Sequence, residues 1–170
     1  KMEKGIIAVN EYLETNVPGV YAIGDVIGNY MLAHVATSEG EHAAQHALGD
    51  RKAMDYRAVP RGLYTSPELG SVGLTEKEAK EKYGEIKVGK FSLAGSGKAL
   101  ILGEKGGMVK VVAEPKYGEV VGVHILGPHA TDLIAEAVLG IQLEAALEEF
   151  AHTIHAHPTL SEAIGEAAHA

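Results

Sequence analysis

The sequence lacks cysteine and tryptophan altogether and has only two phenylalanines among its 170 residues. Without cysteine the chain can form no disulfide and no thiolate metal site, so a structural zinc site would need histidine and carboxylate ligands. No apolar run approaches the roughly 18 residues that cross a bilayer, and no signal peptide is visible. A basic surplus is also missing, since the net charge is −8, which argues against nucleic acid or a membrane surface as a partner.

What is present is an ordinary globular composition, 46% hydrophobic, with nine histidines. The length suits one domain, or one domain plus a fragment of another. We expect residues 1–50 to form one part and residues 63–170 a second part, joined by a charged connector at 51–62 that contains Pro60 and Gly62. Because the first residue is not methionine, we expect a chain cut from a longer protein.

Residues 1–50 are expected to supply a strand, a loop and a helix. The run 20–23 (VYAI) is apolar and β-prone and stands between a Pro-Gly and a Gly-Asp pair, which predicts a buried strand. A helix that stops at Gly49 follows, with a face of small residues suited to packing on a sheet: Ala33, Ala36, Gly40, Ala43, Ala44 and Ala47. Two such elements cannot enclose a core, so this part is predicted to be the edge of a larger domain.

Residues 63–170 are predicted to form an α+β domain. Thr75 and Glu78 have the spacing of a capping box, which opens a short helix. Strands are expected at 86–93, 108–113 and 119–126, the last two paired as a hairpin. Two further helices are indicated by apolar faces, one made by Leu133, Ile134, Ala137, Val138 and Ile141 and one by Leu147, Phe150, Ala151 and Ile154.

The strongest chemical motif is residues 155–162 (HAHPTLSE). Pro158 pushes His157 towards an extended backbone, and Thr159 with Glu162 repeats the capping-box spacing, so a helix is predicted to begin at Thr159. The Glu162 carboxylate on the first turn can then reach an imidazole nitrogen of His157, fix its tautomer and stabilise its protonated form. The pair is a candidate for acid–base catalysis. Glu162 could equally serve the capping box alone, and the two roles are compatible because a carboxylate has two oxygens.

Metal binding by His155 and His157 is the alternative chemistry at this motif. In an extended segment the two side chains alternate on opposite sides, and no third ligand is obvious from the sequence. Without cysteine, zinc would have to rely on histidine and carboxylate ligands only. We therefore expect no metal at this motif.

A second motif spans residues 15–25 (TNVPGVYAIGD) and ends in Gly24 and Asp25. The end of a buried strand is where α/β sheets bind ligands, and Asp25 can accept hydrogen bonds from sugar-like hydroxyls. Alone the signal is weak, because an aspartate after a strand is more often a turn former or a helix cap. The residues that follow, Met31, Leu32, Ala33 and His34, would place backbone N–H groups at a helix N-terminus, where an anionic ligand is stabilised.

Together these motifs make the chain resemble the flavin-dependent pyridine nucleotide–disulfide oxidoreductases, from about residue 5 to 168. Residues 15–25 look like the family's late FAD-contacting segment, and residues 155–162 look like its active-site signature. The form of residues 31–34 (MLAH) and of residues 124–128 (HILGP) is similar to the branch that oxidises dihydrolipoamide. Each piece is short, but the joint match in the family's order is specific.

The resemblance implies a role for each motif. Asp25 would hydrogen-bond the ribityl chain of the flavin, and Met31 to His34 would contact the flavin through backbone and packing. Residues from about 55 onward would form the interface domain of a homodimer. His157 would project into the partner subunit's active site and remove a proton from a dihydrolipoamide thiol, because only the thiolate attacks a disulfide well. Glu162 would orient His157, and electrons would pass through FAD to NAD.

The chain departs from the family pattern in one large respect. The Gly-rich FAD motif, the paired cysteines and the NAD domain, which the family carries before the position of Lys1, are absent, and so is the family's extreme C-terminus. We therefore expect the C-terminal part of a cytoplasmic enzyme, inactive by itself and binding little or no flavin. Its partners would be the lipoyl-bearing proteins of 2-oxo acid dehydrogenase complexes or of the glycine cleavage system.

Two alternatives stay open. A disulfide reductase of the same family that acts on glutathione is disfavoured by the forms of residues 31–34 and of the His-x-His-Pro run. A non-catalytic dimerisation module, with or without a histidine-bound metal, belongs to a different class. The sequence upstream of Lys1 and a metal analysis of the purified chain would discriminate between these alternatives.

Overall fold

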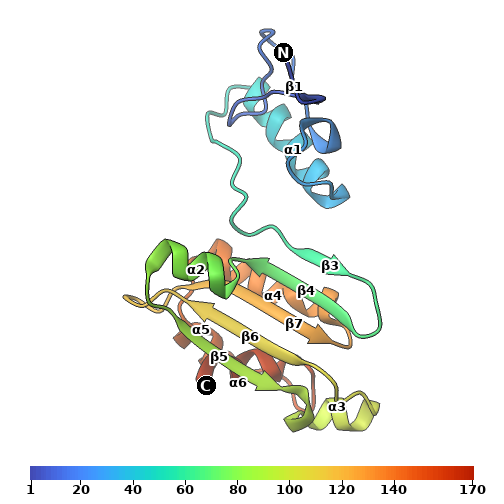
Figure 1. Cartoon of the computed structure of the whole chain (residues 1–170), viewed down its shortest axis with the longest axis vertical. Coiled ribbons are helices and arrows are strands. Elements are labelled where there is room, and N and C mark those ends of the chain that lie inside the picture. The colour runs from blue at the N-terminus through green and yellow to red at the C-terminus, as the bar shows by residue number, and fades with distance from the viewer. The chain divides into compact units, whose positions relative to one another are not determined.

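The computed structural model describes all residues from 1 to 170 and separates them into two compact units, Lys1–Tyr56 and Arg57–Ala170. Figure 1 shows the order of the elements along the chain. The division between the units falls inside the predicted connector, residues 51–62. Each unit has its own buried cluster of apolar side chains.

The first unit contains little regular structure. A short hairpin pairs β1 (Met2–Glu3) with β2 (Ile6–Ile7), the 3-10 turn η1 covers Gly24–Ile27, and the helix α1 covers Ala33–Ala47. The predicted helix is thus confirmed, and Gly49 follows it at a φ of 108°. Its buried side differs from the predicted small-residue face, because Val35, Glu39 and Ala43 are buried while Ala33, Ala44 and Ala47 are exposed.

The prediction of a buried strand at residues 20–23 is wrong for this chain. Tyr21 forms only an isolated antiparallel bridge with Glu14, and Val20 and Ile23 are 48% and 37% exposed. A buried strand needs neighbours that satisfy its backbone N–H and C=O groups, and no other strand of the chain lies beside this run. The apolar run therefore stays an extended loop with a single buried side chain, Ala22.

The second unit is built on an antiparallel five-stranded sheet in the order β3-β4-β7-β6-β5. Its strands are β3 (Arg61–Leu63), β4 (Glu68–Gly73), β5 (Lys87–Ser92), β6 (Met108–Ala113) and β7 (Val120–Gly127). The predicted strand at 86–93 and the predicted hairpin are confirmed, with Val111 opposite Val123 at the centre of the β6–β7 pair. Strands β3 and β4 contain glycine and charged residues instead of alternating apolar residues, and they were not predicted from the sequence.

Helices cover the two faces of this sheet unequally (Figure 1). The helices α4 (Ala130–Gln142), α5 (Leu147–His152) and α6 (Glu162–His169) enclose the main core on one face, where Val109, Val123 and Ile164 are almost fully buried. The helix α2 (Glu76–Tyr83) packs on the other face and opens with the predicted capping box of Thr75 and Glu78. A short helix α3 (Gly97–Leu102), which the sequence did not predict, follows the 3-10 turn η2 (Leu93–Gly95).

Two glycines let the helices approach the sheet closely. A Cβ atom on Gly70 of β4 would collide with the carbonyl oxygen of Ala130 at the start of α4, and one on Gly89 of β5 would collide with that of Ala167 in α6. Since backbone atoms cannot move aside as a flexible side chain can, both positions require glycine. The contacts fix α4 and α6 on the sheet, and α6 directly follows the segment that carries His157.

Candidate functional site

The segment between α5 and α6 carries His157 and is anchored at both ends by buried side chains. Phe150 in α5 is 4% exposed, while Leu160 and Ile164 on the other side are 7% and 0% exposed. The helix predicted to begin at Thr159 begins instead at Glu162. Only half of the capping box forms, because the Thr159 hydroxyl donates to the carbonyl of Ala156, 2.6 Å away, and caps no N–H group.

The other half of the capping box positions Glu162. Its Oε2 accepts the Thr159 backbone N–H at 2.8 Å, and its Oε1 lies 2.9 Å from Nδ1 of His157. The structural and the chemical role considered for Glu162 are therefore both present, one on each oxygen. The hydrogen bond from the Thr159 N–H, followed by the one from His157, lowers the pKa of Glu162 below its ordinary value of 4.5, which keeps it a carboxylate at neutral pH.

This contact defines which nitrogen of His157 is available for chemistry. Because a carboxylate only accepts hydrogen bonds, the proton in the bond to Glu162 belongs to Nδ1, and the neutral ring then has its lone pair on Nε2. The side chain is 77% exposed, and Nε2 makes no hydrogen bond within the chain. The pair can therefore accept a proton from an incoming group at Nε2 while Glu162 holds the ring in place.

His155, two residues earlier, forms a second pair with a different carboxylate. Its Nε2 lies 2.9 Å from Oε1 of Glu136, which projects from α4, and its side chain is only 10% exposed. Glu136 was not predicted as the partner of His155, because 19 residues separate the two in the sequence. His155 and His157 thus have separate partners, and no group of three or more His, Cys, Asp or Glu side chains in the chain could hold a metal ion.

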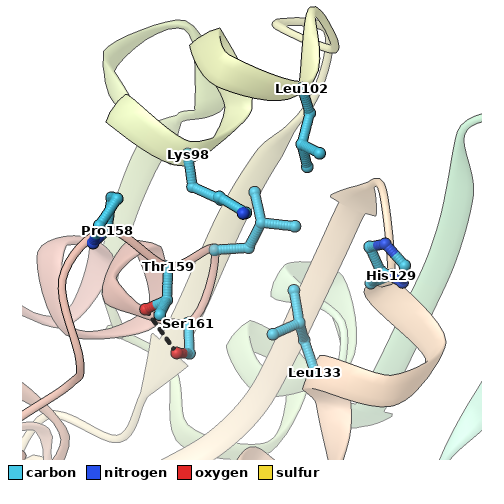
Figure 2. A pocket seen from close by; sticks show the side chains of 8 residues that line it. Lys98, Leu102, His129, Leu133, Pro158, Thr159 and Ser161 are labelled. Atoms are coloured by element: carbon cyan, nitrogen blue, oxygen red, sulfur yellow. Dashed lines mark hydrogen bonds between the residues drawn. The ribbon is translucent and has the colours of Figure 1, made fainter.

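A cavity of about 410 Å³ adjoins this segment on the side of α3 and α4 (Figure 2). Pro158 and the three residues after it form one wall. Leu133 of α4 and His129, the N-cap of that helix, form another. Lys98 and Leu102 of α3 close the cavity from above in the view of Figure 2. His157 does not line it, so the cavity and the imidazole face different surroundings.

The first unit places the predicted cofactor residues around one turn and one helix N-terminus. Asp25 is exposed in η1, and its carboxylate makes no hydrogen bond within the chain. Met31 is 72% exposed, Leu32 is the N-cap of α1 without a capping side chain, and Ala33 and His34 begin the helix. An exposed carboxylate, a helix N-terminus without a capping side chain and the exposed Met31 side chain fit the sugar-like, anionic and aromatic parts of a flavin dinucleotide.

Residues 59–168 match the model of the pyridine nucleotide-disulphide oxidoreductase dimerisation domain, and residues 1–40 match the pyridine nucleotide-disulphide oxidoreductase model. The chain belongs to the pyridine nucleotide-disulphide oxidoreductases, flavoprotein oxidoreductases with a dimerisation domain.

Within this family the chain is similar to dihydrolipoyl dehydrogenases. It is 52% identical over 167 residues to the one from Bacillus subtilis and 48% identical over 168 residues to the one from Thermus scotoductus. These alignments cover 98% and 99% of the chain but 35% and 36% of the two relatives. The chain therefore spans about a third of the length of the curated relatives it matches.

Solved structures give the same fold. The LpdA protein of Mycobacterium tuberculosis superposes with a TM-score of 0.91 and 29% identity over 96% of this chain and 36% of its own length. The α+β class, the dimerisation domain and the preceding FAD-domain segment predicted from the sequence are confirmed by this likeness and by the family match. None of the helices combines the length and apolarity that a bilayer crossing requires.

Proposed function

We propose that this chain is the C-terminal part of a dihydrolipoamide dehydrogenase, in which His157 is the acid–base catalyst and Glu162 orients it. The observation that carries the proposal is the 2.9 Å contact between His157 Nδ1 and Glu162 Oε1, which leaves Nε2 exposed as the basic nitrogen. Identities near 50% to dihydrolipoyl dehydrogenases support this substrate over glutathione.

The proposed chemistry starts with proton removal. Nε2 of His157 takes the proton of a dihydrolipoamide thiol, and the resulting thiolate attacks one sulfur of a disulfide, which only the deprotonated form does well. The disulfide bond breaks, a mixed disulfide forms, and the other sulfur leaves as a thiolate. The imidazolium so formed is stabilised by Glu162, whose carboxylate stays ionised at neutral pH. Since the chain has no cysteine, that disulfide comes from another polypeptide segment, which we assign to the partner subunit of a homodimer.

The cofactor residues belong to the same proposal. In the whole protein Asp25 would accept hydrogen bonds from the ribityl chain of FAD, and Met31 to His34 would contact the flavin with backbone N–H groups and apolar surface. FAD, when bound, would carry the electrons from the reduced cysteine pair to NAD. The partners would be lipoyl-bearing proteins of 2-oxo acid dehydrogenase complexes or of the glycine cleavage system, in the cytoplasm, although a relative from pea is mitochondrial.

The test of this function is a substrate comparison in the whole protein that carries this chain. We expect dihydrolipoamide-dependent reduction of NAD, a flavin absorbance spectrum, and little activity with glutathione. Glutathione turnover without lipoamide turnover would instead support the glutathione-type alternative.

The 170-residue chain by itself gives a second, independent test. We expect it to be colourless and without lipoamide activity, because it has no cysteine pair and only the last segment of an FAD domain. Flavin bound at one per chain after purification would contradict this part of the proposal. Zinc bound at one per chain, and lost on His155→Ala, would favour a metal-binding module instead.

A further inference from the structure

The buried carboxylate of Glu39 is unexplained by the proposed chemistry. It projects from the middle of α1, is fully buried at 0% exposure, and lies among small residues of the same helix face, Ala36, Gly40 and Ala43. A carboxylate is rarely buried unless donors surround it, because leaving water is costly for a charge. The groups that donate hydrogen bonds to its two oxygens therefore indicate its structural role.

One oxygen of Glu39 holds the turn that contains Asp25. Oε2 accepts the backbone N–H of Gly24 at 2.7 Å, at the residue where η1 begins. Gly24 has a φ of 72°, a conformation that favours glycine, and its position is tight because a Cβ there would lie 3.2 Å from Cβ of Ala36. The carboxylate thus fixes the backbone that presents Asp25 to solvent.

The other oxygen of Glu39 holds the loop that leads into α1. Oε1 accepts a hydrogen bond from the Tyr56 hydroxyl at 2.8 Å, and the ring of Tyr56 stacks on Tyr30 with centroids 5.5 Å apart. Burial, with the hydrogen bond to Glu39, raises the pKa of Tyr56 to about 12, so the hydroxyl keeps its proton at neutral pH.

We propose that Glu39 and Tyr56 are positioning residues of the flavin site, which hold the Gly24–Asp25 turn and the loop at residues 29–30 at a fixed separation. This inference rests on the proposed function, which assigns Asp25 and residues 31–34 to the flavin. The hydrogen-bond partners of Glu39 are Gly24 and Tyr56, and Asp25 itself is not among them. The effect of Glu39 is on geometry. One oxygen binds the Gly24–Asp25 turn, and the other binds Tyr56, which stacks on Tyr30 just before residues 31–34.

The experiment compares substitutions at Glu39 in the whole flavoprotein, with the dissociation constant of FAD measured by reconstitution of the apoprotein. We expect Glu39→Leu to raise that constant about tenfold, the effect of losing hydrogen bonds to a buried charged acceptor. Glu39→Gln should stay within about twofold, because the amide oxygen can accept the Gly24 N–H and the amide nitrogen can donate to the Tyr56 oxygen. Glu41→Leu, at an exposed position of the same helix, is the matched control and should change nothing.

A second substitution, Tyr56→Phe, and hydrogen exchange at the Gly24 amide test the same inference independently. Tyr56→Phe removes only the hydroxyl, so it carries the test if Glu39→Leu fails to fold, and we expect about a threefold weaker FAD affinity. In the 170-residue chain, Glu39→Leu should speed hydrogen exchange at the Gly24 amide, which Glu41→Leu should leave protected. An unchanged FAD dissociation constant in both Glu39→Leu and Tyr56→Phe would overturn the inference, as would a Glu39→Gln protein as impaired as Glu39→Leu. Absence of flavin from the unsubstituted whole protein would refute the proposed function itself.

Discussion

Two histidine–glutamate pairs involve the same short segment between α5 and α6. His157 with Glu162 and His155 with Glu136 have the same nitrogen–oxygen separation, 2.9 Å. Their burial differs, since the His157 side chain is 77% exposed and the His155 side chain 10% exposed. The same chemical pair thus occurs in two different surroundings, one exposed to solvent and one largely buried.

The two pairs also differ in how far apart their members lie in the sequence. Glu162 lies five residues from His157 on the first turn of α6, so that pair is local and leaves Nε2 open to a substrate. Glu136 lies on α4, so the His155 pair joins two parts of the fold that are distant in sequence. We infer that the exposed pair performs chemistry while the buried pair holds the segment on α4.

The largest expected effect is on catalysis at the exposed pair. His157→Ala in the whole protein should slow oxidation of dihydrolipoamide by about 10² to 10⁴-fold, the usual cost of losing a general base. Flavin content should not change, and stability should change by no more than about 0.5 kcal/mol because the side chain is exposed. Stopped-flow reduction of the flavin and its absorbance measure the two quantities. Near-normal lipoamide turnover would remove His157 from the mechanism.

The buried pair should respond in the opposite way. His155→Ala leaves Glu136 without its partner and should destabilise the chain by about 2 kcal/mol, since breaking a largely buried pair costs more than losing an exposed one. Urea unfolding of the 170-residue chain gives the measurement, and His152→Ala, an exposed histidine on α5, is the matched control. Equal stabilities for His155→Ala and His152→Ala would erase the distinction drawn between the two pairs.

A smaller effect is expected when the orienting carboxylate alone is neutralised. Glu162→Gln can still accept the Thr159 N–H, so the start of α6 should be kept. It stabilises the imidazolium of His157 less well, and we expect thiol oxidation to slow about tenfold. The activity ratio between Glu162→Gln and His157→Ala, measured in the whole protein, then separates orientation from proton transfer. A Glu162→Gln protein as slow as His157→Ala would show that the two residues act as one unit.

The elements that depend on local sequence could be predicted. The capping box at Thr75 sets the start of α2, apolar periodicity sets α4, and the His157–Glu162 contact follows from their separation in a turn before a helix. The start of α6 differed from the prediction, because the Thr159 hydroxyl donates to the Ala156 carbonyl and caps no N–H group. Local patterns therefore placed this exposed pair correctly.

Features that depend on distant partners could not be predicted. Nothing near His155 in sequence indicates Glu136, and nothing near Glu39 indicates that it would be buried between Gly24 and Tyr56. One general signal was available for Glu39, since a carboxylate inside a face of small residues must find donors once the face packs. The roles of His157, Asp25 and residues 31–34 remain predictions, because geometry alone does not test them.

The smallest expected effect is the contribution of Glu162 to stability in acid. Its pKa is lowered in the folded chain, first by the Thr159 N–H and then by His157. A group with a lowered folded pKa stabilises the fold above its ordinary value, here 4.5, and this stabilisation is lost as the pH falls through the folded pKa. The unfolding free energies of the parent chain and Glu162→Gln should therefore differ at neutral pH and converge as the pH falls through the lowered folded pKa of Glu162. Glu166→Gln removes an exposed carboxylate from the same helix and controls for the change in net charge. A gap that persists unchanged into acid would mean that Glu162 supports the segment by packing, and that the exposed pair is not held by its charge.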